Sequence, residues 1–252
     1  MKAKIITKKI SLGMILGMLF ITGIIHADTL NPDQILATVD DVINAPKDQE
    51  MTIKMVVIDK KGNEKVRQIV MMQKGSSKRV GKFLSPADQK GIGFLSLPGG
   101  LTYVYLPAYK KVRRIASQTK NNKFAGTDFT YEDMEAARYS EKWRAKLAKE
   151  DDAHYVLDLT PIDNAGSDYS KLAIWVQTDN YYPTRIEYYD QAGTMIKVMV
   201  RKNVERVGSY WVSKEFEMQN LRTGNRSTMI LEDVKFDKGL SDDVFTERYL
   251  SR

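Results

Sequence analysis

Short runs of β-forming residues, separated by turn signals, fill most of the chain after residue 48. Segments such as QEMTIKMVVID, EKVRQIVMMQK, LTYVYLP and SYWVSKEFEMQ alternate with KKGN, GSS, PGG and VGS, which are typical of tight turns. Because each connection is too short for a parallel crossover, the pattern predicts a mainly β protein with an antiparallel meander of roughly ten to twelve strands.

Two segments have the character of helices instead. In NPDQILATVDDVINAP, Asn31 is a candidate N-cap, Pro32 suits the first helical position, and Ile35, Val39 and Val42 recur at helical spacing. This predicts an amphipathic helix ahead of the strands. The segment KWRAKLAKEDD is rich in charge and predicts a second, solvated helix.

The strands themselves are apolar on both faces. Stretches such as IVMM, FLSL, YVYL, LAIWV and MIKVMV break the apolar-polar alternation of a sheet with one wet face. Something must therefore cover the second face, and the first helix and the segments 84–95 and 117–150 are the only non-strand material. Two interpretations stay open: a partly open apolar concavity, or a closed barrel packed with side chains.

The first 27 residues, MKAKIITKKISLGMILGMLFITGIIHA, have the order of a secretory signal peptide. Four lysines precede a short apolar run that ends in a small residue, Ala27. Glycines, serine and threonine interrupt the run, which is weak for a membrane span. We expect cleavage after Ala27, a periplasmic location, and a single domain over residues 28–252.

Composition limits the classes of binding site and catalytic chemistry that the chain can contain. The formal net charge of +7 falls to +3 without the four lysines of the signal, so the chain offers little argument for nucleic acid binding. The absence of cysteine excludes disulfides, thiolate catalysis and acylation of an N-terminal cysteine. His154 is the only histidine after residue 27, and no Met-x-Met run is present, so we expect neither a metal site nor a cofactor.

The segment NKFAGTDFTYEDMEAARYSEKW gathers carboxylates and aromatics in the middle of the strands. A catalytic interpretation pairs Asp128 with Glu132 or Asp133 as acid and base. Such a pair requires a geometry that spacing alone does not define.

A structural interpretation of the same segment is favoured. Gly126 makes a turn, and Thr130 with Asp133, or Asp128 with Glu132, caps a short helix that begins near Tyr131. The apolar residues of the segment then point to the interior, so that the segment partly plugs or gates a cavity.

Four ordered motifs, GKFLSPADQKGIGFL, YVYLPAYKKVRRI, FAGTDFTYEDM and YPTRIEYYDQAGTMIK, resemble the outer-membrane lipoprotein-sorting protein family with the LolA-like fold. The resemblance covers roughly residues 50 to 250, and it is to the broader group often associated with large exporters. It implies a LolA/LolB-like incomplete antiparallel β-barrel, with an N-terminal helix and short helices covering the concave face, around a hydrophobic cavity for acyl chains. It also implies binding rather than catalysis.

From these patterns we select candidate binding residues. The candidates for the hydrophobic cavity are Val70, Met72, Phe94, Leu95, Tyr103, Tyr105, Phe124, Phe129, Met134, Ile174 and Tyr188. The basic cluster Lys110, Lys111, Arg113 and Arg114 is a candidate contact for anionic headgroups or a transporter, or else protects an exposed strand from edge pairing.

The expected function is a periplasmic carrier of a lipid or acylated lipoprotein that works with an inner-membrane exporter and touches the membrane transiently. Two alternatives stay open: an envelope hydrolase or transferase that uses the carboxylates between Asp128 and Asp133, and a docking subunit of an exporter that carries no cargo.

Overall fold

A computed structural model describes residues 31–163 and 165–252. The predicted signal peptide lies outside these residues. The strands are β1 (Asp48–Ile58), β2 (Glu64–Lys74), β3 (Lys78–Ser85), β4 (Gly93–Leu97), β5 (Leu101–Leu106), β6 (Lys111–Ile115), β7 (Trp143–Glu150), β8 (His154–Pro161), β9 (Lys171–Gln177), β10 (Pro183–Tyr189), β11 (Met195–Val207), β12 (Tyr210–Asn220) and β13 (Arg226–Phe236). The helices are α1 (Pro32–Ile43), α2 (Tyr139–Lys142) and α3 (Glu247–Leu250).

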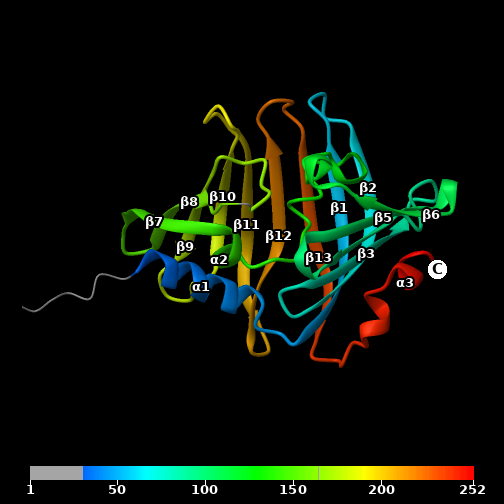
Figure 1. Ribbon diagram of the computed structural model, residues 1–252, viewed down its shortest axis with the longest axis horizontal. Coiled ribbons are helices and arrows are strands. Elements are labelled where there is room, and N and C mark those ends of the chain that lie inside the picture. Colours follow the sequence, from blue (N-terminus) through cyan, green and yellow to red (C-terminus); the bar gives the residue numbers. More distant parts are fainter. Residues whose placement is uncertain (1–30, 164) are drawn as a thin grey trace, which may run out of the picture.

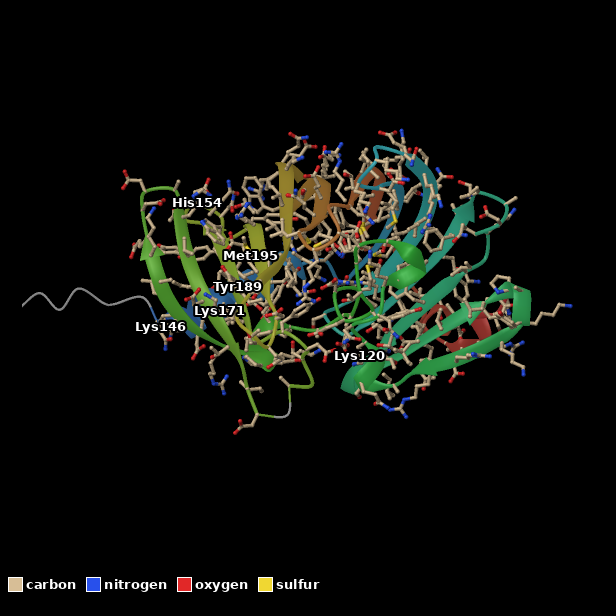
Figure 2. The ribbon with its side chains drawn as sticks, turned by 90° about the horizontal axis from the view of Figure 1, so that it is seen from above. Lys120, Lys146, His154, Lys171, Tyr189 and Met195 are labelled. Atoms are coloured by element: carbon tan, nitrogen blue, oxygen red, sulfur yellow. The ribbon has the colours of Figure 1, made fainter. Side chains whose placement is uncertain are left out.

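All thirteen strands form one antiparallel sheet, in the order β6-β5-β4-β3-β2-β1-β13-β12-β11-β10-β9-β8-β7. The sheet is strongly curved but does not close, because β6 and β7 remain its two edges (Figures 1 and 2). The predicted mainly β, incomplete barrel is therefore confirmed, and the fully closed barrel is excluded.

The thirteenth strand comes from a segment that the sequence analysis assigned to a helix. KWRAKLAKEDD forms β7, in which Trp143, Ala145 and Leu147 are more buried than the intervening Arg144 and Lys146. This is the period of two that a strand requires, and pairing with β8 along the whole strand supplies its hydrogen bonds. The helix prediction was wrong because charge composition outweighed this alternation.

The strand order puts β6 and β7, which follow one another in the chain, at opposite edges of the sheet. Strands β1 to β6 add outward on one side of β1, whereas β7 to β13 return toward β1 from the other side. Residues 116–142, here called the crossing segment, must therefore pass from one edge of the sheet to the other (Figure 1). Phe124 lies inside the curve, stacked on Phe83 at 5.5 Å and edge-on to Phe94 at 5.1 Å.

Helix α1 extends the cover on the concave side. Asn31 caps it by accepting the N–H of Asp33 at 3.0 Å, and the apolar face buries Ile35, Leu36 and Val39 in the main core, as the sequence predicted. The helix packs on α2, β7 and β12. The buried carboxylate of Asp40 accepts two backbone N–H groups of the crossing segment and so fixes the helix to it.

The convex face has a smaller core of its own. Val80 and Leu95 on β3 and β4 are buried by Phe245 and Leu250 from the C-terminal segment. The apolar residues on the second face of these strands are therefore covered by the end of the chain, whose helix α3 packs on β4 and β5 and is seen at the right of Figure 1.

The start of β1 holds this C-terminal segment through one buried carboxylate. Asp48 accepts the N–H groups of Lys238, Gly239 and Leu240 at 2.8 to 3.1 Å. We expect Asp48→Ala to lower the free energy of unfolding by about 1–3 kcal/mol, because three donors lose their acceptor. Urea unfolding measures the change. Glu64→Ala, which removes an exposed carboxylate at the start of β2, is the control, and equal losses in both variants would contradict the expectation.

Candidate functional site

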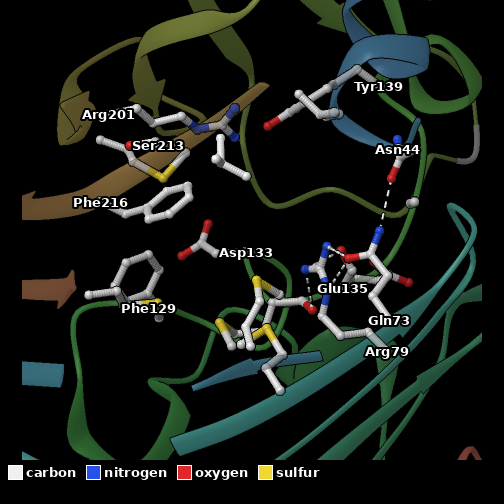
Figure 3. Close-up of a pocket in the computed structure, with 18 of the residues that line it drawn as sticks. Asn44, Gln73, Arg79, Phe129, Asp133, Glu135, Tyr139, Arg201, Ser213 and Phe216 are labelled. Atoms are coloured by element: carbon white, nitrogen blue, oxygen red, sulfur yellow. Dashed lines mark hydrogen bonds between the residues drawn. The ribbon is translucent and has the colours of Figure 1, made fainter. Parts of the chain in front are cut away.

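A cavity of about 260 Å³ lies between the concave face of the sheet and the crossing segment (Figure 3). Its walls come from the end of α1, from β1 to β3, from β10 to β13 and from the crossing segment. A single buried water needs only about 10–15 Å³, so the space is suited to a larger ligand. The open apolar concavity that the sequence left as one of two alternatives is therefore present in this fold.

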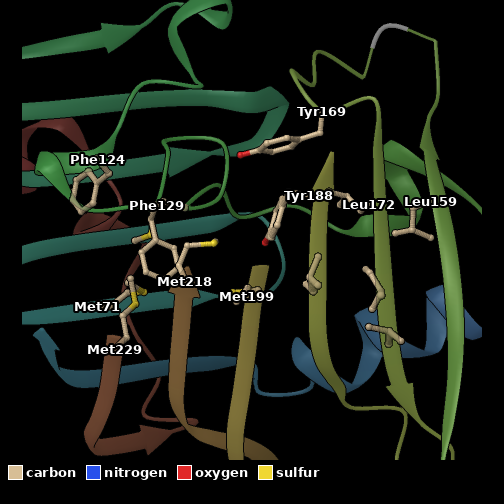
Figure 4. Close-up of a cluster of buried hydrophobic side chains, with 14 of the residues drawn as sticks. Met71, Phe124, Phe129, Leu159, Tyr169, Leu172, Tyr188, Met199, Met218 and Met229 are labelled. Carbon is tan, nitrogen blue, oxygen red and sulfur yellow. The ribbon is translucent and has the colours of Figure 1, made fainter. Parts of the chain in front are cut away.

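Methionine is the most frequent apolar residue in the cavity wall. Nine methionines follow residue 27, and five of them, Met51, Met71, Met134, Met199 and Met229, line the cavity. Met71 and Met229 lie beside Phe129 in the same buried cluster (Figure 4). Unbranched, polarizable side chains can repack around ligands of different shape, which a rigid branched core does not allow.

One buried ion pair anchors the crossing segment to β11. Lys197 Nζ lies 2.6 Å from Asp133 Oδ2, and both side chains are at most 5% exposed. The Tyr169 hydroxyl donates to the other oxygen of Asp133 at 2.9 Å, and the ammonium lies 4.9 Å from the ring centres of Tyr169 and Tyr188. Burial raises the pKa of both tyrosines well above the ordinary value, so they stay neutral hydroxyls.

Glu135 forms a second buried anchor in the same segment. Its carboxylate contacts Lys120 Nζ at 2.9 Å and Lys142 Nζ at 2.5 Å. Burial alone would raise the pKa of Glu135, but the two lysines outweigh it and hold the pKa below the ordinary value. Arg79 on β3 adds hydrogen bonds to the carbonyls of Met134 and Glu135.

The three carboxylates of the catalytic interpretation have separate partners. Asp128 accepts from Ser227 Oγ at 2.8 Å and contacts Lys123, whereas Glu132 accepts from Ser167 Oγ at 2.5 Å. Asp133 belongs to the lysine pair described above. These three residues therefore do not form a pair of hydrogen-bonded carboxylates that could act together as acid and base.

The predicted capping pair is present, but the helix after it is not. The Thr130 N–H donates to Asp133 Oδ2 at 2.7 Å, and the Asp133 N–H donates to Thr130 Oγ1 at 3.2 Å. Residues 131–134 form only a turn, because the chain then leaves to donate the Ala136 N–H to Ser96 Oγ. The helix prediction failed here because contacts with the sheet determine the path of the segment.

The structure distributes the eleven predicted cavity residues over three places. Phe129, Met134 and Tyr188 line the cavity. Phe94, Phe124 and Ile174 lie in the same core without lining it. The other five, on the convex side or in strands whose alternation directs them there, are Val70, Met72, Leu95, Tyr103 and Tyr105.

Strand register explains this distribution. In IVMM, Ile69 and Met71 are buried in the concave core, so Val70 and Met72 between them face the other way. Both faces of the strand are apolar, and the sequence therefore carries no sign of which set faces the cavity. The same ambiguity hid the cavity methionines other than Met134, and no local pattern marked Arg79, Lys197 or Arg201.

The basic cluster Lys110, Lys111, Arg113 and Arg114 is exposed on and beside the edge strand β6. The Arg113 guanidinium lies 5.6 Å from the ring centre of Tyr109, which is 63% exposed. The cluster is therefore accessible and remote from the cavity lining.

Comparison with known proteins identifies others that share this fold. A family model described only as an uncharacterized protein matches residues 75–252. A domain from Vibrio parahaemolyticus, assigned to outer-membrane lipoprotein sorting, has a solved structure with a TM-score of 0.79 and 27% identity, covering 88% of this chain and 100% of that one. The family model covers more than half of the chain, which therefore belongs to that family of uncharacterized proteins, and the expected similarity to lipoprotein-sorting proteins of LolA-like fold is confirmed.

Two further solved structures share the fold. A DUF1329 family protein from Desulfovibrio piger has a TM-score of 0.82 at 23% identity, covering 87% of this chain and 97% of that one. A LolA superfamily protein from Nitrosomonas europaea has a TM-score of 0.74 at 21% identity, covering 87% and 99%. No curated protein sequence matches the chain.

The described residues contain neither a candidate membrane-spanning helix nor a candidate metal site. Within residues 31–163 and 165–252, no helix has the length and apolar character needed to cross a membrane. In the same residues, no group of three or more histidine, aspartate and glutamate side chains is arranged to hold a metal ion.

The buried Lys197–Asp133 pair gives a test of how the crossing segment is held. We expect Lys197→Met to lower the free energy of unfolding by about 3–5 kcal/mol, because Asp133 is left as an uncompensated buried charge. Adding Asp133→Leu should recover a large part of the loss. Urea unfolding of the single and double variants measures both effects, and a double variant as unstable as the sum of the single variants would contradict the expectation.

Glu132 gives a test in pH. Burial raises its pKa above the ordinary value of 4.5, despite hydrogen bonds from Ser167 and Asp168. The folded protein thus keeps this proton where the unfolded chain has lost it, and stability falls as the pH rises through the raised pKa. We expect Glu132→Gln to gain stability relative to wild type as the pH rises above the ordinary pKa of 4.5. The free energy of unfolding is measured across this pH range for wild type and Glu132→Gln, with the exposed Glu141→Gln as the control. A difference between Glu132→Gln and wild type that does not change with pH would contradict the expectation.

Proposed function

We propose that this protein is a periplasmic carrier that holds an acyl chain of a lipid or lipoprotein in the cavity. The observation that carries the proposal is the methionine-lined space of about 260 Å³, enclosed in a fold shared with lipoprotein-sorting proteins. The signal peptide, cleaved after Ala27, directs the protein to that compartment.

The energetics support a cavity of this kind. Each methylene that leaves water contributes about 0.8 kcal/mol, so a chain of ten contributes about 8 kcal/mol to transfer into a dry cavity. A bilayer offers a similar gain, and a carrier must therefore accept and release the chain with little net change. Adaptable methionine walls and a cover held by a few side-chain contacts suit both steps.

The crossing segment acts as the cover of the cavity. Side chains anchor it: Arg67 Nη1 donates to the Ala125 carbonyl at 2.6 Å, and Lys197 and Arg79 hold Asp133 and the backbone next to it. In the described part of the chain, the backbone of the crossing segment pairs with no strand of the sheet. A β-bridge between Lys123 and Thr130 joins two parts of the segment itself. Opening it therefore breaks discrete polar contacts and leaves the sheet intact.

We assign the exposed basic cluster at β6 to transient contact with an inner-membrane exporter or anionic headgroups during loading. Its distance from the cavity separates docking from cargo binding. An enzyme that uses Asp128, Glu132 and Asp133 is less well supported, because each carboxylate is held by partners of its own. A docking subunit without cargo is a possible outcome of the test below.

Met71 and Met72 offer a matched pair for this test, because they are the same residue type on opposite faces of β2. The mature protein, purified from the periplasm without detergent, should release a stoichiometric acylated species on organic extraction. Met71→Trp should reduce that species at least tenfold by filling the cavity, whereas Met72→Trp should retain it. Mass spectrometry of the extracts, against a mock purification, measures the yield.

Circular dichroism confirms that both variants are folded, and Met51→Trp, at a partly buried cavity position, replaces Met71→Trp if that variant is unstable. A clean extract from folded wild-type protein would contradict the carrier and favour a docking subunit. Equal loss in the Met71 and Met72 variants would contradict the assignment of the cavity.

A further inference from the structure

The carboxylates that line the cavity have partners within the chain. Asp133 has Lys197 at 2.6 Å, and Glu135 lies between Lys120 and Lys142. Glu132 accepts hydrogen bonds from Ser167 Oγ and the Asp168 N–H. None of the three forms a hydrogen bond or ion pair with a cavity arginine side chain among the described residues.

Arg201 on β11 has a positive charge without such a partner. Its Nε is buried and has no hydrogen-bond partner in the described part of the chain, and its Nη1 reaches only the Pro183 carbonyl at 3.5 Å. The guanidinium lies 5.6 Å from the ring centre of Tyr182 and 5.7 Å from that of Phe216. An arginine held between aromatic rings with a donor unused is oriented but not neutralised.

Arg79 lines the same cavity from β3. It donates to the Gln73 side-chain oxygen at 2.7 and 3.0 Å and to backbone carbonyls, and none of its partners among the described residues is a carboxylate. Burial, with a smaller contribution from the positive charge of Arg201, lowers the pKa of Arg79 to about 10, although Tyr139 and Glu135 act in the opposite direction. Arg79 still carries its proton at neutral pH.

Tyr139 lies near enough to both arginines for their charges to act on its hydroxyl. Its side chain points into the cavity toward the Arg201 guanidinium, with Arg79 on the opposite wall (Figure 3). The charges of both Arg201 and Arg79 act on its hydroxyl, although burial is the larger influence and raises the pKa of Tyr139. The cavity thus presents two guanidiniums and a hydroxyl from facing walls, all able to donate to a bound oxyanion.

We propose that the cavity takes an anionic amphiphile, with its oxyanion head, a phosphate or carboxylate, bound by Arg201 and Arg79 and its alkyl chain along the methionine wall. This inference rests on the carrier function and specifies the chemical class of the cargo. Buried charges require compensation, and a guanidinium matches the geometry of carboxylate and phosphate oxygens. The cargo supplies the negative charge that the protein does not.

Calorimetry with single-chain probes of equal length tests this assignment. The probes are dodecyl phosphate, dodecanoate and dodecanol, each below its aggregation concentration, together with inorganic phosphate. The variants are Arg201→Met and Arg201→Lys, and Arg226→Met, which removes an equal charge from an exposed position on β13, is the control. The Arg201→Lys variant keeps the test valid if Arg201→Met is poorly folded.

Wild-type protein should bind dodecyl phosphate or dodecanoate at least about tenfold more tightly than dodecanol, the effect of one charge-assisted hydrogen bond. Arg201→Met should reduce this ratio about tenfold, Arg201→Lys should reduce it less, and Arg226→Met should leave it unchanged. The stronger of the two anionic probes identifies the head as phosphate or carboxylate.

Three results would overturn the proposal. If dodecanol binds wild-type protein as tightly as the anionic probes, the carrier remains but the anion site is wrong. If inorganic phosphate binds as tightly as dodecyl phosphate, the site takes a soluble anion rather than an amphiphile. If no alkyl probe binds folded protein, the carrier function itself fails, and the cargo assignment fails with it.

Discussion

The pairing of β1 with β13 is the constraint on which the structure depends. Because the first and last strands lie side by side in the middle of the sheet, the two halves of the chain extend in opposite directions and end at the distant edges β6 and β7. The connection between these edges has to cross the interior of the curve. The cavity is the space left between that connection and the concave wall, so the topology creates the site before any cavity residue is chosen.

The wall and the cover are held by different kinds of interaction. Continuous backbone ladders join the strands, and such ladders resist local opening. Individual side chains hold the crossing segment, including Asp40, Arg67, Asp128 and the Lys197–Asp133 pair. Fully satisfied polar contacts in a low-dielectric interior are strong, yet each is a single contact that can break alone. A rigid wall beneath a separable cover is the mechanical requirement of a carrier.

The cavity combines two kinds of chemistry. Its methionines provide apolar, adaptable surface, whereas Arg79 and Arg201 provide guanidiniums that form no ion pair with a carboxylate side chain of the described chain. The lysines of the same region are all matched to Asp133 or Glu135. This contrast between matched lysines and unmatched arginines indicates a ligand more strongly than the number of charges does.

The sequence by itself determined the strand-rich fold, the helix at Pro32–Ile43 and the place of the crossing segment, because local alternation, capping and turn residues encode these features. The four ordered motifs indicated the resemblance to proteins of LolA-like fold. Only the tertiary structure decided that KWRAKLAKEDD is a strand, that Met71 rather than Met72 faces the cavity, and that Arg201 lies there without a carboxylate. Each of these depends on pairing between distant segments, and strands that are apolar on both faces carry no local sign of which side turns inward.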